Sequence, residues 1–172
     1  MTIGGLVQVI PPPEAPTASF SGAWGPVEAE LGTRLPQDYK DFVRIFGSGY
    51  LFEFMGINVP YSRNPNVRLV SQARVIYRSF IEDDELEHPL WPAPAGLLPF
   101  GATDNGDYLF WKTTGDPDDW TVAIWSRGDV AFEFLDCDLT DFLAGLATGT
   151  NIPECLPDDL FYCETLFKPD PA

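Results

Sequence analysis

Residues 97–125 read LLPFGATDNGDYLFWKTTGDPDDWTVAIW, and this stretch decides the fold. Its apolar runs alternate with acidic loops that contain glycine, a pattern that predicts strands joined by turns. Asn105-Gly106 lies between two such runs, and Asn-Gly in that position favours a hairpin with a type I′ turn. The run at 108–111 is apolar throughout, which is typical of a strand covered on both faces.

Two more strands are expected after this hairpin. The first spans 120–125, and the second spans 130–134, where Val130, Phe132 and Phe134 alternate with Ala131 and Glu133. Alternation with a period of two places one face of a strand toward the core and the other toward water. The stretch therefore predicts an antiparallel meander.

Helices are expected on both sides of the meander, because apolar residues recur there at intervals of three and four. A short helix over 26–32 comes first, and a second one opens at Leu35-Pro36. A third is expected over 66–81 and a last one from Asp138, a suitable N-cap, to Gly149. The apolar faces consist of Tyr39, Phe42, Val43 and Phe46; Leu69, Ala73, Ile76 and Phe80; and Leu139, Phe142, Leu143 and Leu146. Short strands are expected at 51–54 and 57–59.

The chain of 172 residues favours one domain with a sizeable core. We expect a proline-rich arm over 1–20, in which residues 6–10 add an edge strand, a domain over 21–150, and a tail over 151–172 that packs on it. The predicted fold class is α+β: a single domain with a mostly antiparallel mixed sheet packed by N-terminal and C-terminal helices.

The chain carries 10 basic and 26 acidic residues, a formal net charge of −16. Such a charge repels nucleic acid and anionic membranes and attracts a basic protein partner. Solubility alone explains it equally well. The three cysteines have no paired spacing, as expected for a reducing cytosol. No apolar run has the length of a membrane span, and no secretory signal is evident, so a cytoplasmic location is expected.

The sequence offers little catalytic chemistry. His88 is the one histidine, and it follows an acidic run instead of standing near a nucleophile motif. His88 with Cys137, Cys155 and Cys163 lacks the paired spacing of a zinc site. The aspartates in the loops fit turn chemistry better than a calcium site. We therefore expect no enzyme, no metal and no cofactor.

Two motifs, in this order, carry a resemblance to a known family. The first is LGTRLPQDY at 31–39 with FGSG at 46–49, and the second is LPFG at 98–101 with TDNGD at 103–107 and FW at 110–111. Together they resemble the SUKH superfamily, which holds fungal cell-wall regulators and many bacterial immunity proteins. The similarity extends over residues 24–150, and the loop GDPDDW at 115–120 is similar to actinobacterial members in particular.

The resemblance implies an α+β fold in which both motifs are structural, and it implies binding instead of catalysis. Bacterial members typically neutralise a polymorphic toxin, often a nuclease or a deaminase, so the expected partner is a basic toxin domain. The alternatives are a regulatory module that binds a cellular protein and a small hydrolase. No site residue carries over from the family.

The candidate partner-binding residues come from two acidic segments. An interface needs charged groups that steer the partner and aromatic anchors that hold it. We therefore single out Asp116, Asp118, Asp119 and Trp120, and the run Glu82, Asp83, Asp84 and Glu85.

Overall fold

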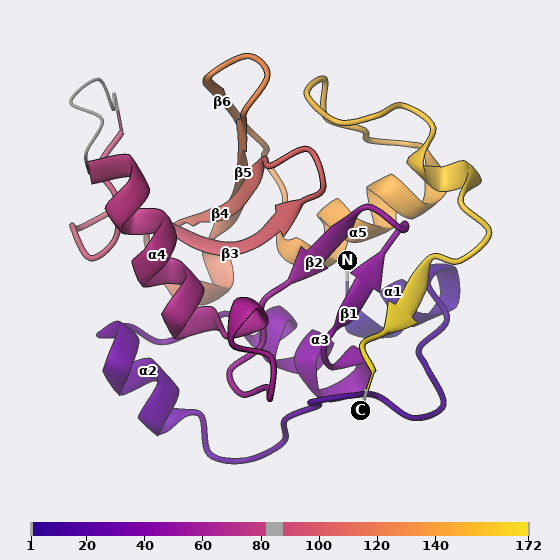
Figure 1. The fold of residues 1–172 in the computed structure, drawn as a ribbon, viewed down its shortest axis with the longest axis horizontal. Coiled ribbons are helices and arrows are strands. Elements are labelled where there is room, and N and C mark those ends of the chain that lie inside the picture. Colours follow the sequence, from indigo (N-terminus) through magenta and orange to yellow (C-terminus); the bar gives the residue numbers. More distant parts are fainter. Residues whose placement is uncertain (1, 82–87, 172) are drawn as a thin grey trace.

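A computed structural model describes residues 2–81 and 88–171 of the chain (Figure 1). One seven-stranded sheet has the order β6-β5-β4-β3-β2-β1-β7, and all its pairings are antiparallel. The strands are β1 (Gly49–Leu51), β2 (Met55–Ile57), β3 (Leu97–Thr103), β4 (Tyr108–Lys112), β5 (Thr121–Ser126), β6 (Ala131–Phe134) and β7 (Phe167–Pro169). With the helices below, this confirms the α+β fold class.

Both faces of the sheet are covered. The helices are α1 (Ile3–Val9), α2 (Gly25–Leu31), α3 (Gln37–Phe46), α4 (Leu69–Ile81) and α5 (Leu139–Thr148), with short 3-10 turns η1 (Pro65–Val67), η2 (Pro117–Asp119) and η3 (Leu160–Tyr162). Leu109 and Trp111 of β4 belong to the main core with α3 and α5, whereas Phe110 packs with Ile76 and Phe80 of α4. The wholly apolar run at 108–111 is explained by this double burial.

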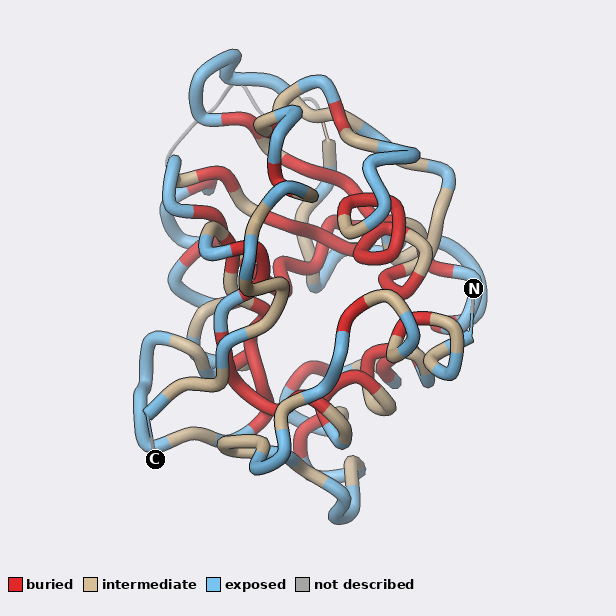
Figure 2. The backbone as a smooth tube through the Cα atoms, turned by 90° about the vertical axis from the view of Figure 1, so that its right-hand side faces the viewer, coloured by how far each residue is buried: buried red, intermediate tan, exposed pale blue. Residues whose placement is uncertain are grey.

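Buried backbone runs through the interior of the molecule, and exposed segments form the outer loops (Figure 2). Within residues 2–81 and 88–171, no helix combines the length and the apolar character needed to cross a bilayer.

The helix ends follow ordinary capping chemistry. The Asp138 side chain accepts a hydrogen bond from the Asp141 amide at the start of α5, as predicted, and Gly149 ends that helix in the left-handed conformation. Gly47 ends α3 at φ 68°, where a Cβ atom would lie 2.1 Å from the Thr17 carbonyl oxygen. Only glycine fits this position, because both the backbone angle and the space exclude a side chain.

Two local predictions were wrong. The segment expected to add an edge strand near the N-terminus is the helix α1, whose Leu6 and the following Ile10 are completely buried. Leu6 and Ile10 stand four residues apart, a helical spacing that lets both reach the core beside α5. The type I′ turn at Asn105-Gly106 is also absent, because Gly106 has positive φ and Asn105 does not.

The strands β1 and β2 are shifted relative to the prediction. Met55-Gly56 was expected to separate two strands and instead lies within β2. The turn occurs at Phe52-Glu53, and both residues have positive φ, 56° and 52°. Phe52 is nonetheless buried and its amide donates to the Leu166 carbonyl in the tail. Tertiary contacts therefore hold a turn that lacks the usual turn residues.

Candidate binding surfaces

The acidic loop at 116–119 is largely occupied by contacts within the chain. Asp118 Oδ1 accepts a hydrogen bond of 2.7 Å from the amide of Gln37, the first residue of α3. Asp116 Oδ2 lies 2.7 Å from Arg34 Nη2 in an exposed ion pair. The loop thus joins the second half of the chain to the LPQDY motif. Asp119 is exposed, and its carboxylate has no hydrogen-bond or ion-pair partner among the described residues.

Trp120 is 4% exposed and belongs to the main core, where its ring lies 6.2 Å from that of Trp111. In this conformation its indole stabilises the fold and offers no contact area to a partner. The other four candidates, Glu82, Asp83, Asp84 and Glu85, lie outside the described residues.

Both sequence motifs have structural contacts, as the resemblance implies. Asp38 Oδ1 accepts from the Tyr39 amide at 2.6 Å, and Asp38 Oδ2 accepts from the Thr140 amide at 3.2 Å, at the start of α5. Burial and the charge of Asp138 raise the pKa of Asp38 from 3.8 to about 6. Asp107 is buried and accepts from the Thr103 hydroxyl at 2.7 Å.

A set of aromatic residues lies at the edge of the sheet formed by β6, and we call it the aromatic edge. It consists of Trp125, Phe132, Phe134 and His88. The His88 ring lies 4.7 Å from Phe134 and 5.6 Å from Phe132, and Phe134 is 42% exposed. β6 pairs only with β5, so within residues 2–81 and 88–171 its other side carries no strand.

Charged and apolar groups surround the aromatic edge. Val130, immediately before β6, is 71% exposed. The ammonium group of Lys112, at the end of β4, lies 5.7 Å from the centre of the Phe134 ring. Phe80, near the end of α4, contacts Trp125 at 5.0 Å.

The aromatic edge was not among the predicted site residues. Its signal in the sequence is the alternation of Phe132 and Phe134 with Ala131 and Glu133, which indicates one apolar face. That alternation cannot tell a covered face from an exposed one. The position of β6 at the end of the strand order, which decides this, depends on pairings across the whole chain.

The cysteines are poorly suited to nucleophilic chemistry, which requires a thiolate. Burial, together with nearby aspartates, raises the pKa of Cys137 to about 11. Burial and a hydrogen bond with Glu133 raise the pKa of Cys155 to about 12. In the described part of the chain no three His, Cys, Asp or Glu residues gather in a group that would hold a metal ion.

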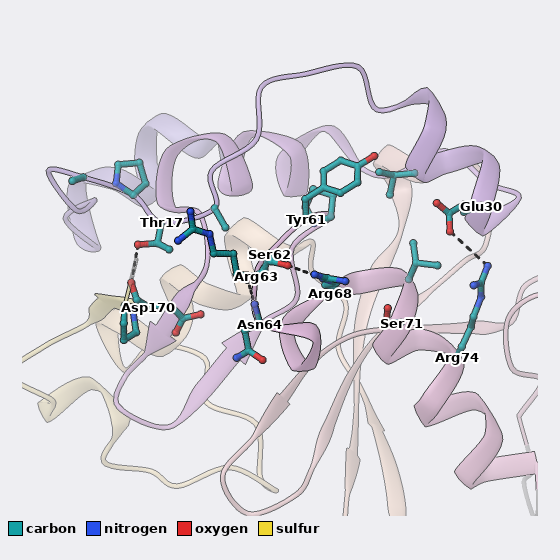
Figure 3. A pocket seen from close by; sticks show the side chains of 17 residues that line it. Thr17, Glu30, Tyr61, Ser62, Arg63, Asn64, Arg68, Ser71, Arg74 and Asp170 are labelled. Carbon is teal, nitrogen blue, oxygen red and sulfur yellow. Dashed lines mark hydrogen bonds and ion pairs between the residues drawn. The ribbon is translucent and has the colours of Figure 1, made fainter.

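A groove of about 1220 Å³ lies between the N-terminal segment, α2, the start of α4 and the C-terminal residues. Arg63, Arg68 and Arg74 line it together with Tyr61. Figure 3 shows Arg63 extending toward Thr17 and Arg74 toward Glu30, with Arg68 between them in this view. Sequence reasoning missed this groove because its walls come from segments far apart in the chain.

The sheet, its covering helices and the two structural motifs define an α+β domain of the SUKH type. A family model described as SUKH_6, SMI1-KNR4 cell-wall, matches residues 23–143. The chain therefore belongs to this family, which confirms the resemblance to the SUKH superfamily. No curated protein and no solved structure matched the chain.

Proposed function

We propose that the chain is a non-catalytic immunity protein that neutralises a cognate toxin, a nuclease or a deaminase, by covering it. Membership of the SUKH_6 family supports a protein partner. The observation that carries the proposal is the aromatic edge, where the exposed ring of Phe134 stands on β6, a strand that pairs on one side only among the residues that the structure describes.

The aromatic edge has the composition of an interface centre. Aromatic side chains are enriched in interfaces and dominate their energetics, because they bury a large apolar area with few rotatable bonds. Phe134 already stacks on Phe132 at 5.9 Å, and it meets the His88 ring edge to face at 4.7 Å. These neighbours hold it in place before a partner arrives, which lowers the entropy lost on binding.

The acidic residues supply the polar part of the proposed surface. A net charge of −16 attracts a basic domain and accelerates the encounter at low salt. The run Glu82, Asp83, Asp84 and Glu85 and the exposed Asp119 are the proposed steering charges. Toxins that act on nucleic acid need a basic surface for their substrate, and such a surface is complementary to these carboxylates.

The test is neutralisation of the toxin encoded beside this gene. We expect co-expression of the chain to rescue growth of cells that carry the toxin. Phe134→Asp and Val130→Asp should abolish the rescue, because each places a charge within the contact. Tyr162→Asp is the matched control, since Tyr162 is 76% exposed on η3, a different element.

Thermal melting of all three variants checks that they fold. Rescue that persists in both Phe134→Asp and Val130→Asp would refute the assignment of the surface. A genome with no toxin beside the gene, together with capture of a non-toxic cellular protein, would favour the regulatory alternative and overturn the immunity role.

A further inference from the structure

The arginine groove defined by Arg63, Arg68, Arg74 and Tyr61 lies outside the proposed interface with the toxin. It contains three of the ten basic residues in a chain that has 26 acidic ones. Its walls also include apolar groups, among them Val27, Pro60 and Val70. A concave, partly apolar site with a few converging polar groups is the usual form of a small-ligand site.

The loop that carries Arg63 is held in place by several local hydrogen bonds. Arg68 Nε donates to the Ser62 carbonyl at 2.6 Å, and Asn64 Oδ1 accepts from the Asn66 amide at 3.0 Å. The Leu69 amide donates to the Val59 carbonyl at 2.8 Å. The loop is thus fixed to the start of α4, and the arginines are presented from a defined backbone.

The guanidinium groups of the groove are available to a ligand. Arg63 has no partner among residues 2–81 and 88–171, and Arg68 uses only its Nε in the bonds found there. Arg74 lies 3.8 Å from Glu30, and both side chains are more than half exposed. Such a long, exposed ion pair is weak, so an incoming anion can compete for Arg74.

We propose that the arginine groove binds a small phosphorylated ligand that carries a planar ring, of the nucleoside phosphate class. Guanidinium groups bind phosphate through paired hydrogen bonds. Tyr61, which is 48% exposed on the groove wall, offers a ring for stacking. The volume of about 1220 Å³ accommodates an organic phosphate, not only an inorganic ion.

The charge distribution favours a small ligand over a nucleic acid. An extended polyanion that entered the groove would continue over a surface where acidic residues outnumber basic ones, and this costs free energy. A small anion avoids that surface. Charges farther away than about 8 Å are largely screened at physiological salt, so the charges of the groove itself decide, and there three arginines outnumber the carboxylates of Glu30 and Asp170.

The test is calorimetric titration of the full chain with ATP, pyrophosphate and adenosine, without magnesium. We expect ATP to bind, and Arg63→Glu and Arg74→Ala each to weaken it by about tenfold or more. Arg78→Ala is the matched control, because Arg78 is exposed one turn beyond Arg74 on α4 and does not line the groove. Tyr61→Ala should weaken the binding of ATP and leave the binding of pyrophosphate unchanged.

Three results would overturn the proposal. The first is the absence of saturable binding by ATP. The second is an equal loss in Arg78→Ala, which would indicate general electrostatic attraction. The third is tighter binding of a single-stranded oligonucleotide than of ATP. The ability of Arg63→Glu to rescue the growth of cells that carry the toxin is measured in parallel. Because this readout does not depend on the arginine groove, it separates failure of this site from failure of the immunity role.

Discussion

Replacing Asp38 with asparagine should change how stability depends on pH. Burial and Asp138 raise the pKa of Asp38 to about 6 from its ordinary 3.8. The folded state therefore binds a proton more tightly than the unfolded state between these two values. Stability due to this group is greater at low pH and falls as pH rises through the window, until it levels off above about 6.

The size of the effect follows from the same two values. Each pH unit in the window corresponds to about 1.4 kcal/mol, which gives about 3 kcal/mol over the whole range. Asparagine does not titrate, so Asp38→Asn removes this contribution. Because one amide oxygen replaces two carboxylate oxygens, the amide of Tyr39 or of Thr140 loses its acceptor. The diagnostic quantity is therefore the change in the free energy of unfolding with pH, not its absolute value.

The assay is urea unfolding of both proteins from pH 3 to pH 8, a range chosen to bracket the window. The difference in the free energy of unfolding between wild type and Asp38→Asn isolates the contribution of Asp38 from those of the other acidic residues. Relative to the variant, the wild type should lose about 3 kcal/mol of stability as pH rises. Asp119→Asn, at an exposed position, serves as the control for the loss of one negative charge. A pH-independent difference for Asp38→Asn would refute the reasoning.

Three other predictions concern the core, a cap and the thiols. Asp118→Ala should lower the free energy of unfolding by about 1 kcal/mol, because the Gln37 amide loses its cap; an unchanged urea midpoint would show that water replaces it. Leu143→Ala, at a completely buried position of α5, should cost about 2–5 kcal/mol in the same assay, and a smaller loss would mean that the core closes the cavity. Cys137 and Cys155, whose pKa values are about 11 and about 12, should react with a disulfide reagent at pH 8 much more slowly than free cysteine; equal rates would contradict this.

The sequence predicts most of the elements whose signals are local. The apolar run at 108–111 indicates a strand buried on both faces, and Leu109, Phe110 and Trp111 are completely buried. Asp138 and Gly149 mark the ends of α5, because capping depends on a few neighbouring residues.

Features that depend on distant contacts are not predicted. The turn at Phe52-Glu53 contains neither glycine nor asparagine and is held by the tail. The edge strand β7 forms only by pairing with β1, more than a hundred residues earlier. The same limit applies to binding surfaces: Asp116 and Asp118 look free in the sequence, yet they contact Arg34 and Gln37 across the fold.

The most direct test of the proposed interface is hydrogen–deuterium exchange of the chain with and without its toxin. Among the described residues β6 pairs only with β5, so its amides that point away from β5, and that of Val130, should become protected when the toxin covers them. We predict slower exchange over residues 130–134 in the complex, while the amides around Tyr162 stay unchanged. Slower exchange confined to other segments, with residues 130–134 unaffected, would contradict a function based on the aromatic edge.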